Sequence, residues 1–102
     1  MAAYVFANID VKDAQVYEEY KRRVPATIEQ YGGRYLARGG RCEVMEGSLE
    51  AGRIILLEFP TREHAERWYH SPEYAAVRAL RQRSATTDLC IVEGLQNASA
   101  ET

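Results

Sequence analysis

The sequence predicts an α+β fold whose elements follow the order βαββαβ within one domain. Its 102 residues suit a single domain. Runs of β-branched and aromatic residues mark four strands, and apolar residues at helical spacing separate the first strand from the second and the third from the fourth. We expect the domain to cover residues 1–95. A disordered tail is expected over residues 96–102, which are mostly small and polar.

The first half of the chain is typical of a strand, a helix and a strand. Residues 3–10 (AYVFANID) are rich in strand-forming types. Asp13 can cap a helix, and Pro25 should kink it. The glycines at 32–33 end the helix, and residues 34–38 form the second strand. The apolar stripe of the helix consists of Val16, Tyr20, Val24, Ile28 and Tyr31.

The second half is typical of a strand, a split helix and a strand. Residues 53–59 (RIILLEF) are the clearest strand of the chain. Thr61 caps one helical segment, and Ser71 caps the next, which has proline at its first position. Residues 86–93 form the fourth strand. This order is the ferredoxin-like sandwich, an antiparallel sheet with both helices on one face.

Both faces of this sheet are predicted to be apolar. Residues 54–57 do not alternate with polar residues, and the first and fourth strands carry apolar side chains on both sides. Two helices cover only one face, and apolar surface left in water costs roughly 25 cal/mol per Å². We therefore expect the second face to pack on a second copy of the chain, sheet against sheet, in a two-fold homodimer.

Several motifs resemble a known family. They are YLARGG (35–40), the pair Glu46-Gly47, LLEFP (56–60), A-x-x-W-Y-x-SPEY (65–74), Arg81 and VEG (92–94). On these residues the chain resembles the domain-of-unknown-function 1330 family of the dimeric α/β-barrel superfamily. The resemblance implies the ferredoxin-like fold and a homodimer. Fold relatives include cofactor-free monooxygenases of aromatic substrates, muconolactone isomerases and stress-responsive binding proteins, so the fold does not select a function.

Composition argues against several classes of function. The net charge is −2 and the arginines are scattered among glutamates, whereas a nucleic-acid-binding protein would show a clustered basic stripe. No apolar run approaches the roughly 20 residues that span a bilayer, and we expect no signal peptide and no membrane partner. Cys42 and Cys90 are interpreted as reduced thiols of a cytoplasmic protein, with Cys90 in the core. His64 and His70 lack clustered acids, so we expect no metal and no cofactor.

Polar residues interrupt the strands at Asn8, Glu58 and Glu93. We expect the first and third strands to be adjacent and parallel, which would place Asn8 and Glu58 side by side. Glu58 could act as a general base, or it could form an ion pair with Arg34, Arg38 or Arg41 across the dimer. His64 is the other candidate acid or base, with an exposed helix position as the alternative.

The second glycine pair, at 39–40, is flanked by Arg38 and Arg41. Guanidinium groups beside glycine amides can hold an anion. The lysine and hydroxyl residue of a phosphate-binding P-loop are absent, however, and the glycines could simply form a bend. We expect residues 42–47 to continue the strand beyond this bend.

Aromatic residues favour a ligand cleft between helices and sheet, although core filling is the alternative. Its predicted lining is Tyr20, Tyr35, Trp68 and Tyr74. Arg81, which matches the family pattern, could orient an acid or pair with Glu58 or Glu93. The full ligand-binding prediction is Asn8, Tyr20, Tyr35, Arg38, Arg41, Trp68, Tyr74 and Arg81. The predicted function is binding of a small apolar or aromatic acid. A cofactor-independent isomerase or monooxygenase-like enzyme and a protein-binding scaffold remain open as alternatives.

Overall fold

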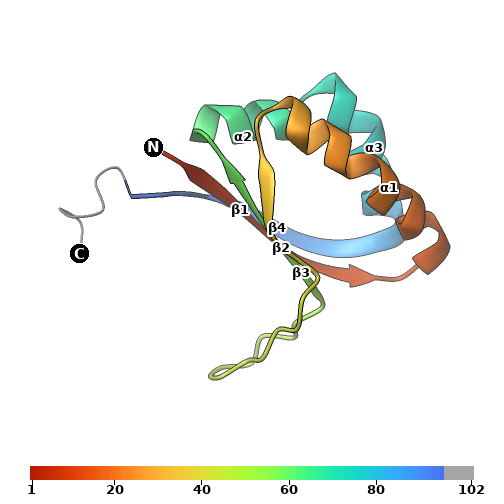
Figure 1. Ribbon diagram of the computed structural model, residues 1–102. Coiled ribbons are helices and arrows are strands. Elements are labelled where there is room, and N and C mark those ends of the chain that lie inside the picture. The colour runs from red at the N-terminus through yellow and green to blue at the C-terminus, as the bar shows by residue number, and fades with distance from the viewer. Residues whose placement is uncertain (96–102) are drawn as a thin grey trace.

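The computed structural model describes residues 1–95 and confirms the predicted order of elements (Figure 1). The elements are β1 (Ala3–Val11), α1 (Ala14–Gln30), β2 (Arg34–Arg38), β3 (Arg53–Phe59), α2 (Arg62–Tyr69), α3 (Pro72–Ser84) and β4 (Ala85–Glu93). The predicted tail, 96–102, lies outside the described residues. The three helices cover one face of a single sheet (Figure 1).

The sheet has the order β2-β3-β1-β4, and every neighbouring pair is antiparallel. The adjacency of β1 and β3 is confirmed, but their predicted parallel direction is wrong. The β2–β3 connection reverses the chain, so β3 runs against β2 and also against β1. Asn8 consequently pairs with Ile54 and Glu58 with Tyr4, which places Asn8 and Glu58 at opposite ends of the strand pair.

The helices begin where capping residues were predicted. Asp13 Oδ1 accepts a hydrogen bond from Val16 N at 3.1 Å, which opens α1. Thr61 and Ser71 cap α2 and α3 in the same way. Each cap satisfies a backbone donor that the first helical turn leaves without a partner. The helix α1 continues through Pro25 without a break.

The core between helices and sheet is built on three large aromatic residues. Phe59, Trp68 and Tyr74 are fully buried, and their rings stack with centroids 5.4 Å apart for Phe59–Trp68 and 4.2 Å for Trp68–Tyr74. Trp68 Nε1 donates a hydrogen bond to Thr27 Oγ1 at 3.0 Å, which satisfies the buried indole. This cluster fixes α1 and α2 against each other, and Trp68 also lines a small cavity between the helices and the sheet.

Two local predictions are wrong. Residues 42–47 form no strand, because residues 39–52 leave the sheet as an arm on the side away from the helices, where no third strand pairs with them (Figure 1). Cys90 is exposed and does not belong to the core. It pairs with Phe6 across β1 and β4, and both point to the face of the sheet that the helices leave uncovered.

Candidate functional site

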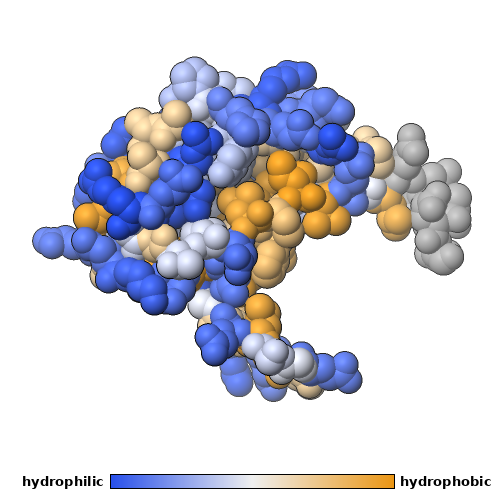
Figure 2. All heavy atoms as spheres, turned by 180° about the vertical axis from the view of Figure 1, so that it is seen from behind, coloured by the Kyte–Doolittle hydropathy of each residue, from blue (hydrophilic) through white to orange (hydrophobic). Residues whose placement is uncertain are grey.

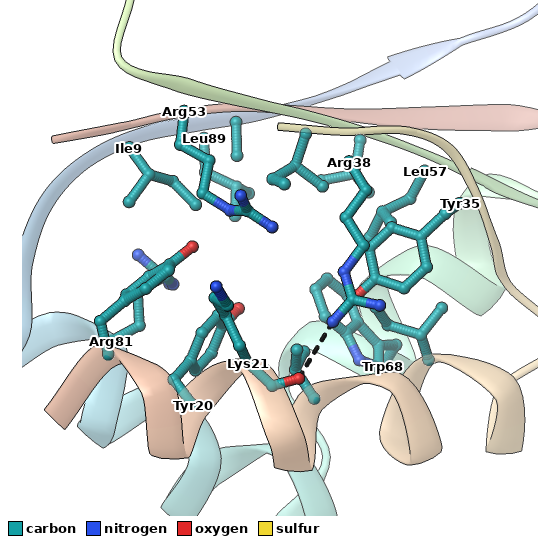
Figure 3. A pocket seen from close by; sticks show the side chains of 16 residues that line it. Ile9, Tyr20, Lys21, Tyr35, Arg38, Arg53, Leu57, Trp68, Arg81 and Leu89 are labelled. Carbon is teal, nitrogen blue, oxygen red and sulfur yellow. Dashed lines mark hydrogen bonds between the residues drawn. The ribbon is translucent and has the colours of Figure 1, made fainter. Parts of the chain in front are cut away.

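A cavity of about 30 Å³ lies between the helices and the sheet (Figure 3). By the usual measure this space holds about two water molecules or one carboxylate group. The strands supply an apolar floor that includes Ile9 and Leu57. In Figure 3, Arg53 reaches from β3 toward the helices, and Tyr20, Lys21 and Arg81 reach from α1 and α3 toward the sheet.

The charges around this cavity are all of one sign. Lys21, Arg38, Arg53 and Arg81 line it, and no carboxylate belongs to the lining. Lys21 is neutralised by Glu18, whose Oε1 lies 3.0 Å from Lys21 Nζ. Arg38 donates to the Lys21 carbonyl at 3.0 Å, and its Cζ lies 4.6 Å from the centroid of the Tyr35 ring. Arg53 and Arg81 remain without any acidic neighbour in the lining.

Arg81 is buried, with 4% of its surface exposed. Its Nε lies 3.4 Å from the Tyr74 hydroxyl, at the long end of hydrogen bonding. Within the described part of the chain no carboxylate forms an ion pair with Arg81. The predicted pairing of Arg81 with Glu58 or Glu93 is therefore wrong. A buried guanidinium normally has an acidic partner, since the desolvation of a lone charge is costly.

Arg53 enters the cavity because Gly39 makes room for it. A Cβ atom at position 39 would lie 2.7 Å from Arg53 Cζ, which is closer than non-bonded carbons approach. Gly39 also has φ +72°, in the left-handed region that favours glycine. The Nε atom of Arg53 is buried and has no hydrogen-bond partner in the described part of the chain. The glycine bend of the YLARGG motif thus leaves space for the Arg53 side chain to line the cavity.

Tyrosine hydroxyls complete the polar lining. The Tyr20 and Tyr74 hydroxyls lie 2.9 Å apart. Burial raises the pKa of Tyr20, and the neighbouring Tyr74 raises it further. Burial also raises the pKa of Tyr17, although Arg53 and Arg81 partly oppose this shift. Tyr17 and Tyr20 are therefore neutral at ordinary pH and can donate hydrogen bonds to an anion.

The structure brings together part of the residue set proposed from sequence. Tyr20, Tyr35, Arg38, Trp68 and Arg81 line the cavity. Tyr74 lies directly behind it, in contact with two of these side chains. Three polar lining residues were missed, namely Tyr17, Lys21 and Arg53. Tyr17 stands three residues before Tyr20 on α1, and this helical spacing could have identified it.

The other candidates lie away from the cavity. Arg41 is exposed on the arm, and its guanidinium lies 3.8 Å from Glu43. Asn8 holds the base of the arm, since its Oδ1 accepts from Gly52 N at 2.8 Å. The side chain of His64 forms a 2.6 Å hydrogen bond with the Thr61 hydroxyl at the start of α2.

Glu58 is placed on the uncovered face of the sheet rather than beside the cavity. Its Oε1 lies 2.6 Å from Arg34 Nη2 of the neighbouring strand. The predicted arginine partner is therefore present, but it belongs to the same chain. This ion pair is partly exposed, and such pairs are a structural feature of many sheet surfaces.

No cluster of three or more His, Cys, Asp and Glu side chains arranged for a metal ion occurs within residues 1–95. In the same part of the chain, no helix is long and apolar enough to cross a membrane.

Comparisons with known proteins identify a family and a fold. The family described as "Domain of unknown function (DUF1330)" matches residues 2–95. No curated protein matches the sequence. RPA0582 from Rhodopseudomonas palustris, a protein of unknown function, aligns with a TM-score of 0.74 at 16% identity, covering 94% of this chain and 84% of that one.

Two further structures share the fold at lower similarity. SnoaB, a cofactor-independent oxygenase from Streptomyces nogalater, has a TM-score of 0.59 at 10% identity and covers 94% of both chains. Rv0793 from Mycobacterium tuberculosis has a TM-score of 0.58 at 18% identity, covering 96% of this chain and 99% of that one. At such identities the likeness establishes the ferredoxin-like fold and leaves the chemistry to the site itself.

Proposed function

Since this chain belongs to the DUF1330 family, whose description assigns no activity, we propose a function from its site: binding of a small apolar or aromatic carboxylic acid between the helices and the sheet. In this proposal Arg81 is the principal anchor of the carboxylate, Arg53 is the second cation, and the neutral hydroxyls of Tyr17 and Tyr20 add donors. The apolar floor of the cavity contacts the part of the acid next to the carboxylate.

The observation that carries this proposal is the burial of Arg81 without an acidic partner among residues 1–95. Protein interiors rarely hold a lone charge, because the desolvation cost is several kcal/mol unless an opposite charge compensates it. Arginine also binds carboxylates through two parallel hydrogen bonds. A bound organic acid would supply the charge that the described residues do not.

Binding is favoured over catalysis by the identity of the lining residues. A general base needs to reach the proton that it abstracts. The two candidate bases, Glu58 and His64, are absent from the lining and are engaged with Arg34 and Thr61. The likeness to a cofactor-independent oxygenase is a likeness of fold, so an oxygenase activity stays the second candidate.

Calorimetric titration with 3-phenylpropanoate, and with 3-phenylpropan-1-ol as the uncharged analogue, tests the proposal. We expect the acid to bind and the alcohol to bind much more weakly. Arg81→Met should weaken binding of the acid by about 30-fold, since a hydrogen bond to a charged group is worth roughly 1.5–3 kcal/mol. Arg83→Met is the matched control, because Arg83 is exposed on the same helix. Equal affinity of wild type and Arg81→Met would refute the anchoring role.

We also propose that the working unit is a homodimer paired through the uncovered sheet face. This face carries exposed apolar side chains, with Val92 at 53% and Leu36 at 47% exposure. Figure 2 shows apolar side chains gathered in the hollow between the body of the molecule and the arm. An exposed apolar patch of this kind is typical of an interaction surface.

Light scattering at micromolar concentration tests the dimer. Wild type should have twice the mass of one chain, and Val92→Asp should shift it toward the monomer by placing a charge in the interface. Ala76→Asp, an exposed position on α3, is the control and should stay dimeric. A wild-type monomer would refute the pairing.

A further inference from the structure

A groove of about 510 Å³ adjoins the cavity along the edge strand β4. Arg81 and Leu89 line both spaces, so they form the boundary between them. The groove side of this boundary includes Tyr69, Gln82 and Thr87. The cavity alone is too small for an aromatic ring, whereas the groove is large enough for one.

Each lining includes one residue with a buried polar side-chain atom that has no partner among the described residues. These atoms are Nε of Arg53, a residue of the cavity lining, and Oγ1 of Thr87, a residue of the groove lining, and both atoms are closed to solvent. Buried polar groups in proteins are nearly always hydrogen-bonded, so an unpaired one calls for a missing partner. Here both atoms belong to residues that line adjoining spaces.

The sheet register places these two residues in one row. Ile9 of β1 pairs with Arg53 of β3 on one side and with Thr87 of β4 on the other. Directly opposed residues in antiparallel strands share a face, and Ile9 faces the helices. Two strand spacings separate Arg53 from Thr87, so their backbones lie about 10 Å apart. Arg53 and Thr87 thus lie on the helix-covered face of the sheet, on either side of Ile9.

We propose that cavity and groove form one binding site, whose ligand is an elongated organic acid with a hydroxyl or carbonyl group at its far end. This inference rests on the proposed acid-binding function. The carboxylate occupies the cavity between Arg53 and Arg81, and the apolar body passes between Arg81 and Leu89. The far polar group meets the Thr87 hydroxyl, which a rotation about χ1 turns toward the groove. Such a ligand supplies an opposite charge to Arg53 and Arg81 and, after the rotation, a partner to Thr87 Oγ1.

Calorimetric titration of four proteins with two acids tests this assignment. The probes are 3-(4-hydroxyphenyl)propanoate and 3-phenylpropanoate, which differ only in the far hydroxyl. We expect wild type to bind the hydroxylated acid about tenfold more tightly, the size of one net hydrogen bond. Thr87→Val should abolish this preference, Thr87→Ser should keep it, and Thr86→Val, at the adjacent exposed position, should also keep it. Valine suits a strand, so Thr87→Val should fold, and circular dichroism checks this.

The outcomes separate this inference from the proposed function. Equal affinity of wild type for both acids, or a preference for the hydroxylated acid that survives in Thr87→Val, would overturn the joint site of cavity and groove and leave acid binding intact. Failure of wild type to bind either acid would overturn the proposed acid-binding function, and with it the joint site of cavity and groove. Loss of the preference for the hydroxylated acid in Thr87→Val, with the preference kept in Thr87→Ser and Thr86→Val, supports the assignment.

Discussion

Replacement of Gly39 by alanine tests how the glycine bend places Arg53. Gly39 has φ +72°, and an alanine there costs about 1 kcal/mol because the left-handed region crowds Cβ. The new Cβ would also lie 2.7 Å from Cζ and 3.3 Å from Cγ of Arg53. The guanidinium is the far end of a flexible side chain, so we expect it to move away at little further cost in stability.

The expected signature of Gly39→Ala is therefore a loss of both stability and affinity. A penalty of about 1 kcal/mol lowers the Tm of a domain of this size by roughly 4–8 °C. Removal of Arg53 from the cavity should weaken binding of 3-phenylpropanoate by about tenfold, the lower end for a hydrogen bond to a charged group. Thermal unfolding measures the first quantity and calorimetric titration the second.

Two other glycines separate these effects. Gly47 has φ +92°, but a Cβ atom added there would have no neighbouring atom within 4 Å, so Gly47→Ala should lose similar stability and keep full affinity. Gly40 has neither a positive φ nor a near neighbour, so Gly40→Ala should change little. Affinity unchanged in Gly39→Ala would refute the view that this glycine positions Arg53.

Three further predictions concern the surrounding structure. Glu58→Gln should change the free energy of unfolding in urea by less than about 1 kcal/mol, because the ion pair of Glu58 with Arg34 is partly exposed. Calorimetric titration should show unchanged acid binding, because Glu58 does not line the cavity. Thr27→Val should cost about 1–3 kcal/mol in urea unfolding, since it leaves Trp68 Nε1 buried without an acceptor. Burial raises the pKa of Tyr20 in the folded state, so the neutral phenol stabilises the fold fully below about pH 10, and this stabilisation is lost as the pH rises further. Urea unfolding measured from pH 8 to 11 should show a decline in the free energy of unfolding. The decline should be shallower for Tyr20→Phe than for wild type.

The fold was predictable because its signals are local. Capping residues at Asp13, Thr61 and Ser71 and the apolar run 53–59 lie within single elements, and each was found where the sequence indicated. The direction of β3 relative to β1 is a property of the connection, and it was misjudged although the order of strands was right. Because of this error Glu58 was predicted to lie beside Asn8, whereas the two residues lie at opposite ends of the β1–β3 pair.

The site was predictable only in part, for physical reasons. Aromatic residues on helices are recognisable from spacing, which accounts for Tyr20 and Trp68. The role of Arg53 depends on strand register and on the space above Gly39, and neither is visible in a linear pattern. Cys90 lies in an apolar run, but strand alternation turns it to the uncovered face.

The unpaired charge of Arg81 leads to a prediction that joins stability to binding. Without ligand, Arg81→Met should be more stable than wild type by about 1 kcal/mol, because methionine removes a buried charge that has no acidic partner within residues 1–95. With 3-phenylpropanoate at a hundred times its dissociation constant, wild type should gain about 2.7 kcal/mol, and the variant, which binds weakly, much less. The order of stability should therefore invert as acid is added, which thermal unfolding at increasing concentrations can follow. A purely structural role for Arg81 predicts the opposite, a variant that is less stable at every concentration of acid, and that result would contradict a carboxylate anchor.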